Sequence, residues 1–219
     1  MCGKFTQMAT WADVVAFSQP LVATPEHAPV VVSTPMRLAQ VMRLGEDGRR
    51  ELAPMRWGFS KPENPAFKPD HMHARAETID TRRTFADSFA ERRGIVLVQT
   101  FNEGEALPNG KTKQWVIRPK DRKPIAIAVI WEEWQGPEGV EATFVMVTVP
   151  PNALIGCITD RMPAILREED WSRWLGEDDA KSLDVKALLR TFDDEGAWEM
   201  SEQAPSKPTK KPPPQGDLF

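Results

Sequence analysis

Residues 94–101, with the sequence GIVLVQTF, form an apolar run rich in β-branched and aromatic side chains. Such side chains are favoured in strands, and Gly, Pro and Asn separate this run from three more of the same kind. Those three runs are Gln114–Arg118, Ile125–Trp131 and Ala142–Val149. Because no helical segment lies between them, we predict that the four runs pair as a mostly antiparallel sheet.

Two runs upstream, Arg37–Leu44 and Arg49–Trp57, flank the turn sequence Gly45–Gly48 and predict a β-hairpin. Helical patterns also occur, mainly late in the chain. They cover Trp11–Phe17, Thr81–Glu91, Arg167–Leu175 and Lys181–Phe192. Strands and helices do not alternate as in a parallel α/β protein, so the sequence predicts the α+β class.

The chain has 219 residues, enough for one folded domain, which we place at residues 1–200. From Ser201 the composition changes to SEQAPSKPTKKPPPQGDLF, which predicts a disordered or extended Pro/Lys-rich tail over 201–219. No apolar run reaches about 18 residues and no secretory signal is present, so we expect a cytoplasmic protein without a membrane partner. A monomer is the default expectation.

The net charge of −4 is unevenly distributed. Residues 1–130 contain 19 Lys and Arg against 14 Asp and Glu, whereas residues 131–219 contain 9 against 18. Local potential governs binding to a phosphate backbone, so the first part of the chain is compatible with nucleic acid. A mixed, solvated surface explains the same counts, and charge alone does not decide between the two.

Cys2 follows the initiator methionine and precedes the small residue Gly3, a context in which methionine aminopeptidases act. Removal of Met1 would leave an α-amine and a thiol on one residue, with ordinary pKa values of about 8 and 8.5. With an aldehyde, the amine forms an imine and the thiol then closes a five-membered thiazolidine ring. The alternative is an ordinary cysteine behind a retained methionine, and the Met-Cys dipeptide does not distinguish the two.

The second cysteine, Cys157, is expected to be a small buried apolar residue. Two cysteines give neither a disulfide framework nor a structural zinc site. We therefore expect no metal and no organic cofactor.

Four segments taken together resemble the SRAP family, whose members couple to abasic sites in single-stranded DNA. The segments are MCGKF at 1–5, HARAET at 73–78, FNEGE at 101–105 and ITDRMP at 158–163. They occur in the family's order, and the resemblance extends from Met1 to about Trp198. It implies one domain with a barrel-like core and flanking helices. It also implies a DNA damage response in which Cys2 traps the ring-opened abasic aldehyde as a thiazolidine cross-link.

The resemblance implies roles for further residues. Glu103 falls at the family's glutamate, whose carboxyl group moves protons while the sugar opens, the carbinolamine dehydrates and the linkage reverses. Partial burial would raise its pKa, whereas without the resemblance Glu103 is interpreted as a surface acid in a turn. The residues expected to contact DNA are Gly3, Lys4, Pro35, Trp57, Arg75 and Arg161.

Among these contacts, Arg75 and Arg161 correspond to arginines that hold the phosphates flanking the lesion through their planar guanidinium groups. The alternative is pairing with Glu77 or Asp160. Trp57 could stack on a base or pack in the core, and its surroundings decide between these roles.

Two positions depart from the family pattern. His73 stands where the family has an asparagine, and Thr159 stands where it has a histidine. Because histidine titrates near neutrality, we predict that His73 takes over hydrogen bonding or proton transfer near the sugar; the alternative is that it only packs. Thr159 has no group that titrates there, so we predict slower reversal of the cross-link than in relatives.

The last five residues, Gln215-Gly216-Asp217-Leu218-Phe219, resemble the Gln-x-Asp/Ser-Leu-Phe peptide by which bacterial polymerases and repair proteins dock on the sliding clamp. Leu218 and Phe219 would fill an apolar pocket, and Gln215 would make polar contacts beside Asp217. The bacterial sliding clamp is therefore a predicted second partner, besides single-stranded DNA.

Two other functions remain open at the level of sequence. Cys2 could act as the thiol nucleophile of an amidohydrolase or self-processing peptidase, with its own amine as the base. The chain could instead be a non-enzymatic adaptor that only binds DNA and the clamp. Amide turnover without a DNA adduct would favour the first function, and DNA binding without an adduct the second.

Overall fold

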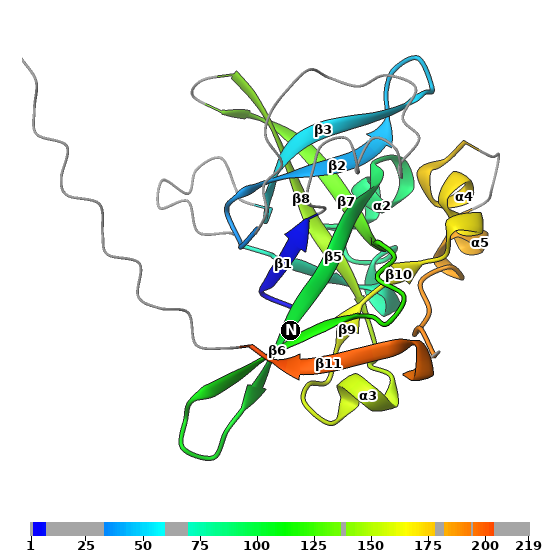
Figure 1. The fold of residues 1–219 in the computed structure, drawn as a ribbon. Helices are drawn as coiled ribbons and strands as arrows, with labels where there is room; N and C mark the ends of the chain where they lie inside the picture. The colour runs from blue at the N-terminus through cyan, green and yellow to red at the C-terminus, as the bar shows by residue number, and fades with distance from the viewer. Residues whose placement is uncertain are drawn as a thin grey trace, which may run out of the picture.

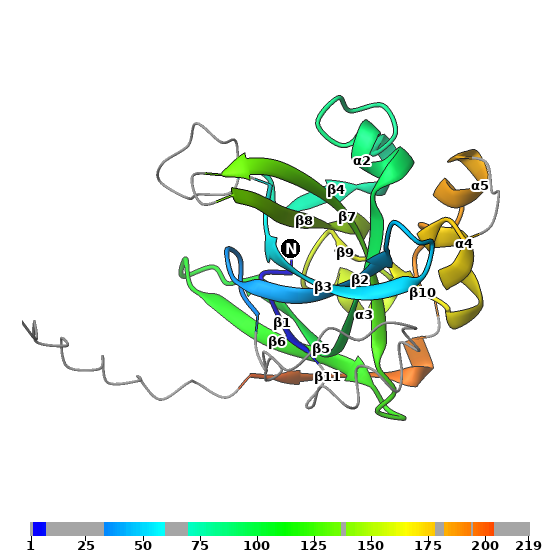
Figure 2. The same cartoon turned by 90° about the horizontal axis from the view of Figure 1, so that it is seen from above.

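A closed β-barrel forms the centre of the molecule. The computed structural model describes residues 2–7, 33–59, 70–136, 139–177, 182–193 and 195–203. In this described part of the chain, five strands pair in a ring (Figure 2). In ring order they are β5 (Arg93–Ala106), β7 (Ile125–Gly136), β8 (Gly139–Val149), β3 (Arg50–Trp57) and β2 (Leu38–Leu44). The ring closes because β5 pairs with both β2 and β7.

Further strands extend this barrel by pairing with β5, β7 and β8 (Figure 1). The strand β1 (Lys4–Gln7) lies along β5, and the strands β6 (Thr112–Pro119) and β11 (Trp198–Glu202) continue the sheet beyond β5. On the other side, β4 (His73–Arg75) and β9 (Met162–Pro163) pair with β8, and β10 (Ile165–Leu166) pairs with β7. Segments far apart in sequence thus meet around β5 and β8.

The helices are short and lie outside the barrel, with α2, α4 and α5 on one flank (Figure 2). The α-helices are α2 (Ala86–Glu91), α3 (Ala153–Gly156), α4 (Trp171–Leu175) and α5 (Ser182–Lys186). Single turns of 3-10 helix are η1 (Ala76–Thr78), η2 (Glu168–Asp170) and η3 (Glu195–Ala197). Within the described residues, no helix is long and apolar enough to span a membrane.

Large apolar side chains fill the barrel interior. Phe5, Trp57, Phe101 and Phe144 have no exposed surface and come from four different strands. The ring of Trp57 lies 5.1 Å from that of Phe5 and stacks on Phe144 at 6.3 Å. This burial supplies the hydrophobic free energy that holds the N-terminal strand β1 against the barrel.

The predicted α+β class and barrel-like core are confirmed, and so is the hairpin between β2 and β3. Its turn closes through a hydrogen bond from Gly48 N to Gly45 O of 3.0 Å, and Gly48 has a φ of +74°, which favours glycine. The sheet is not wholly antiparallel, however. Both β3 and β4 run parallel to β8, although β3 pairs with it at only two positions.

Several predicted boundaries differ from the structure. The helix expected over 81–91 begins only at Ala86, and the strand expected to end at Phe101 continues to Ala106. At the C-terminus, β11 runs to Glu202, two residues past the expected domain end at 200. The helix predicted over 11–17 and the tail from residue 204 lie outside the described residues.

Candidate active site

Pairing of β1 with β5 brings Cys2 next to Glu103. Lys4 pairs with Asn102 and Phe5 pairs with Phe101, so the residues just before β1 approach the far part of β5. Cys2 is 1% exposed and Glu103 has no exposed surface. The main chain of Cys2 forms a hydrogen bond with the Glu103 carboxyl group. A potential nucleophile and a carboxyl group thus share one buried site.

Burial controls the protonation of both groups. Removal from water, and then the charge of Glu103, raises the pKa of the Cys2 thiol to about 12. Burial also raises the pKa of Glu103 to about 7, and the nearby charge of Asp160 acts in the same direction. Near neutrality the thiol therefore keeps its proton, while the Glu103 carboxyl group exists in both its forms.

His73 contacts the same N-terminal residue from β4. Its Nε2 atom lies 2.7 Å from the carbonyl oxygen of Cys2. Burial lowers the pKa of His73 to about 4, against the opposing effect of this hydrogen bond. The ring is therefore neutral at physiological pH and, since a carbonyl oxygen only accepts, Nε2 donates the proton.

Trp57 lies behind His73, inside the barrel. Its indole meets the His73 ring edge-on, with 6.0 Å between ring centroids, and its Nε1 donates to Met72 O at 3.1 Å. Because Trp57 has no exposed surface, core packing is the one of its two roles considered from the sequence that the structure favours over base stacking. Its position between Phe5 and Phe144 makes it a core residue that supports the site.

Arg161 is held inside the protein by a network of hydrogen bonds. Its guanidinium group donates to both carboxylate oxygens of Glu77, at 2.6 and 2.9 Å, and to Thr148 O at 2.6 Å. Hydrogen bonding to Arg161 lowers the pKa of Glu77. Of the pairings considered from the sequence, the structure contains that with Glu77, and Arg161 is 8% exposed.

The other residues predicted to contact DNA lie around this cluster with more exposure. Arg75 is exposed at the end of β4 and, two residues from His73, lies on the same face of that strand. Gly3 is exposed and Lys4 is partly exposed beside Cys2. Pro35 lies in the segment after Ser33, whose main chain exchanges two hydrogen bonds with Phe5. These four residues are close to the N-terminus in space or in sequence.

The segment 158–161 completes the cluster. Asp160 acts on the pKa of Glu103 through its charge, which places this segment at the site, and Thr159 immediately precedes it. Sequence reasoning missed two contributors. Asp160 is one, and Asn102 is the other, because its backbone hydrogen bond to Cys2 opposes the rise in the thiol pKa. Asn102 lies in the motif FNEGE and Asp160 in the motif ITDRMP, and this position next to predicted site residues was the only signal in the sequence.

Cys157 does not belong to the site. It is exposed, contrary to the prediction of a buried apolar residue, because it caps the short helix α3 at the surface. Among the described residues, no group of three or more His, Cys, Asp or Glu side chains is arranged to hold a metal ion. Gln215, Asp217, Leu218 and Phe219 lie outside the described residues.

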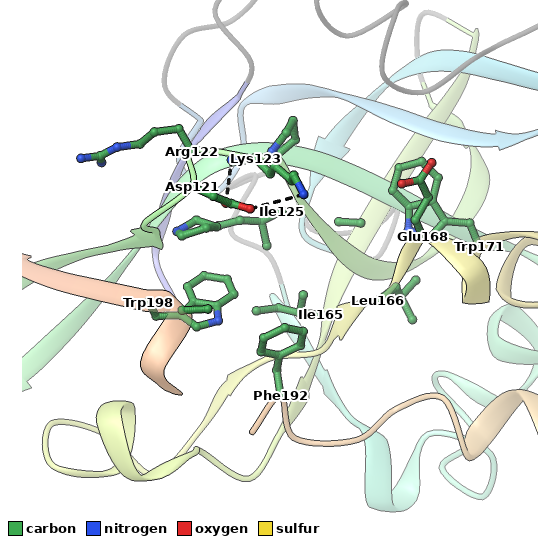
Figure 3. Close-up of a pocket in the computed structure, with 14 residues that line it drawn as sticks. Asp121, Arg122, Lys123, Ile125, Ile165, Leu166, Glu168, Trp171, Phe192 and Trp198 are labelled. Carbon is green, nitrogen blue, oxygen red and sulfur yellow. Dashed lines mark hydrogen bonds and ion pairs between the residues drawn. The ribbon is translucent and has the colours of Figure 1, made fainter. Parts of the chain in front are cut away.

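A separate cleft of about 630 Å³ opens near Trp198, at the opposite end of β11 from Glu202 (Figure 3). Its walls are largely apolar and its rim carries both signs of charge. The labelled residues that line it are Asp121, Arg122, Lys123, Ile125, Ile165, Leu166, Glu168, Trp171, Phe192 and Trp198. None of the predicted site residues is among those that line this cleft.

The model of the SOS response associated peptidase (SRAP) family matches residues 1–204. This match spans nearly the whole chain and includes all four motif segments. The protein belongs to the SRAP family. The residues around Cys2 in this SRAP protein therefore lie in a part of the chain that the family model covers.

Curated relatives carry names that describe abasic site processing. Abasic site processing protein YoqW of Bacillus subtilis is 29% identical over 223 residues, covering 97% of each chain. Abasic site processing protein YedK of Escherichia coli is 27% identical over 190 residues, covering 81% of each. A crystal structure of a Bacteroides thetaiotaomicron protein has the same fold, with a TM-score of 0.78 at 21% identity, covering 92% of this chain and 91% of that one.

Proposed function

We propose that this protein senses abasic sites in single-stranded DNA and forms a covalent thiazolidine cross-link through Cys2, as part of a DNA damage response. The observation that carries the proposal is the buried contact between Cys2 and Glu103, which joins a nucleophile to a proton carrier. Membership of the SRAP family and the names of YoqW and YedK support it. Cleavage of the Met1–Cys2 bond must come first, because it releases the α-amine.

The reaction needs only the sugar and groups of the protein. The Cys2 amine adds to the aldehyde carbon, and the carbinolamine loses water to give an imine. The thiol then adds to the imine carbon and the nitrogen gains a proton, so one C–N and one C–S bond form and one water leaves. Because its pKa is about 12, the thiol must lose its proton to a base during this addition.

Glu103 is the residue that we assign to these proton transfers. With a pKa of about 7, it has an acid form that can protonate the departing hydroxyl and a carboxylate form that can accept the thiol proton. Thr159 lies beside Asp160 at the same site and has no group that titrates near neutrality. We therefore propose slower reversal than in relatives with histidine, measurable as transfer to a competing abasic oligonucleotide.

Phosphate binding is assigned first to Arg75 and Lys4, with Gly3 and Pro35 beside them. Arg75 is exposed and on the face of β4 that carries His73, so its guanidinium can meet a phosphate while His73 contacts Cys2. Arg161 lies nearby, but it would have to share its donors between a phosphate and Glu77. Its proposed contribution to DNA binding is thus smaller than that of Arg75.

The raised pKa of the Cys2 thiol does not separate the cross-linking and peptidase functions, since the thiol must lose its proton in both reactions. A gel assay with abasic single-stranded DNA tests the proposal. Wild-type protein is expected to form a heat-stable adduct, Cys2→Ala none, and Glu103→Ala much less. Absence of any adduct with wild-type protein, or hydrolysis of peptide amides in its place, would contradict the proposal.

A second partner is proposed on the sequence of residues 215–219. The QGDLF peptide would dock on the bacterial sliding clamp through Leu218 and Phe219, with Gln215 and Asp217 at its polar end. Such docking would keep the protein near replicating DNA in the cytoplasm without changing the chemistry at Cys2.

A further inference from the structure

His73 and Cys2 are 71 residues apart in sequence, yet one hydrogen bond joins them. The bond runs from His73 Nε2, in β4, to the Cys2 carbonyl oxygen just before β1, over 2.7 Å. Its acceptor belongs to the residue whose amine and thiol would react with the sugar. This contact therefore acts on the orientation of the nucleophile itself.

The His73 ring has a fixed place in the site. Trp57 meets it edge-on with an interplanar angle of 85°, and the indole is anchored by its own hydrogen bond to Met72 O. Met72 directly precedes His73, and the main chain of β4 pairs with β8 at Met146. The donor is thus held from behind by a fully buried ring and from the side by a strand, which is the arrangement that preorganises a contact.

The electrostatic setting of the ring argues against a role in proton transfer. The ring is partly buried, with a pKa lowered to about 4, and its Nε2 proton is donated to a carbonyl oxygen. The group at this site that changes its protonation near neutrality is Glu103. Of the two alternatives predicted for His73 from the sequence, hydrogen bonding therefore fits the ring, and proton transfer fits Glu103.

We infer that His73 is a positioning residue: its Nε2–H holds the Cys2 carbonyl, and thereby aims the amine and thiol of the mature N-terminus at the abasic aldehyde beside Glu103. This inference rests on the proposed function. The first residue of a chain ordinarily frays, and removal of Met1 takes away the peptide bond that precedes Cys2. The carbonyl contact then becomes one of the restraints that limit rotation of the reactive residue, beside its hydrogen bonds to Lys4, Asn102 and Glu103, and it lowers the entropy lost on reaching the geometry of attack.

The experiment compares full-length His73→Asn and His73→Phe with wild type, each confirmed by intact mass to begin at Cys2. Asparagine keeps an N–H donor, whereas phenylalanine keeps a ring and loses the donor. His71→Phe is the matched control. His71 lies two residues before the start of β4, and its ring packs edge-on against Phe85, with 5.3 Å between the ring centroids. Rates of adduct formation are measured against the concentration of abasic single-stranded DNA, from pH 6 to pH 8.

The maximal rate of His73→Phe is expected to fall about fivefold or more, the factor that corresponds to loss of one hydrogen bond. The DNA concentration that gives half of the maximal rate should stay within about twofold of the wild-type value. His73→Asn should retain most of the wild-type rate. The midpoint of the rate against pH should be the same in every variant. A wild-type rate in His73→Phe, or a rate in His73→Asn as low as in His73→Phe, would overturn the inference alone. Loss of the pH midpoint in His73→Phe would assign His73 to proton transfer and overturn it too. No adduct with wild type would instead remove the proposed function, and the inference with it.

Discussion

Glu103 is a carboxyl group with no exposed surface, and its position costs folding free energy. Its pKa rises from an ordinary value of 4.5 to about 7, so the folded protein binds this proton more tightly than the unfolded chain. The associated stability is fully present below pH 4.5 and is lost as the pH rises through about 7. The shift corresponds to about 3 kcal/mol of folding free energy at higher pH.

Replacement of Glu103 by Gln should therefore raise the stability of the fold and lower the rate of adduct formation. The variant keeps the shape of the side chain and removes its charge, so its melting temperature should exceed that of wild type at pH 8.5 and approach it at pH 5. Adduct formation should fall by about 100-fold, because no carboxyl group remains to move protons. Thermal unfolding at both pH values tests this, with Glu105→Gln as the control. An equal difference in melting temperature at the two pH values would count against it.

The two cysteines should differ in reactivity. Cys2 is buried with a pKa raised to about 12, whereas Cys157 is exposed. Since alkylation requires an accessible thiolate, native protein should take up one equivalent of iodoacetamide at pH 7.5 and denatured protein two. Mass spectrometry of Cys157→Ser should then show almost no labelling of the native state. Rapid labelling of Cys2 in that variant would contradict the buried site.

At the scale of single elements, β4 and the segment just before β9 each carry an arginine, and the two have different surroundings. Arg75 is exposed at the end of β4, while Arg161 is held by Glu77 and Thr148 O just before β9. The pair of Arg161 with Glu77 links this segment to the turn η1. Arg75 can accept a phosphate without breaking a contact of this kind, so the two substitutions should have separable effects.

Arg75→Ala should weaken binding to single-stranded DNA and reduce the slope of log affinity against log salt by about 0.7, the value for one phosphate contact. Arg161→Ala should mainly lower thermal stability, because it leaves Thr148 O and Glu77 without their donor. Fluorescence titrations at several salt concentrations check both, with the exposed Arg83→Ala as the control. An unchanged slope in Arg75→Ala would exclude the phosphate contact.

The sequence predicted the long elements better than the short ones. The β2–β3 hairpin followed from glycines at both ends of its turn, and β7 and β8 from their apolar, β-branched runs. The strands β1 and β4 were missed, since four and three residues are too few for a pattern and depend on pairing with β5 and β8. Glu103 was accordingly placed in a turn by its local sequence, although pairing with Trp115 of β6 keeps it in a strand.

At the scale of the whole molecule, the barrel assembles a site from four segments that the chain keeps far apart. Resemblance indicated Cys2, Glu103 and His73 as members, and the structure brings these three together. The resemblance could not indicate that Trp57 is buried behind His73, because the dipeptide Trp57-Gly58 does not by itself determine how exposed the tryptophan side chain is. Burial and pairing are properties of the closed barrel, and they also determine the unusual pKa values.

The C-terminal peptide should act independently of the barrel. Deletion of Gln215–Phe219 is expected to abolish capture of the protein by immobilised sliding clamp and to leave adduct formation unchanged. A Leu218→Ala/Phe219→Ala double variant, which keeps the length of the chain, is the matched comparison and should also lose capture in the pull-down. Equal capture of both variants and wild type would remove the clamp from the account.

The most direct measurement is the intact mass of the adduct with an abasic oligonucleotide, followed by sequencing of the cross-linked peptide. The predicted mass is that of the chain without Met1, plus the oligonucleotide, minus one water, with the modification on Cys2. A chain that still begins with Met1, an adduct on another residue, or no adduct at all would contradict the assignment of the chemistry to Cys2.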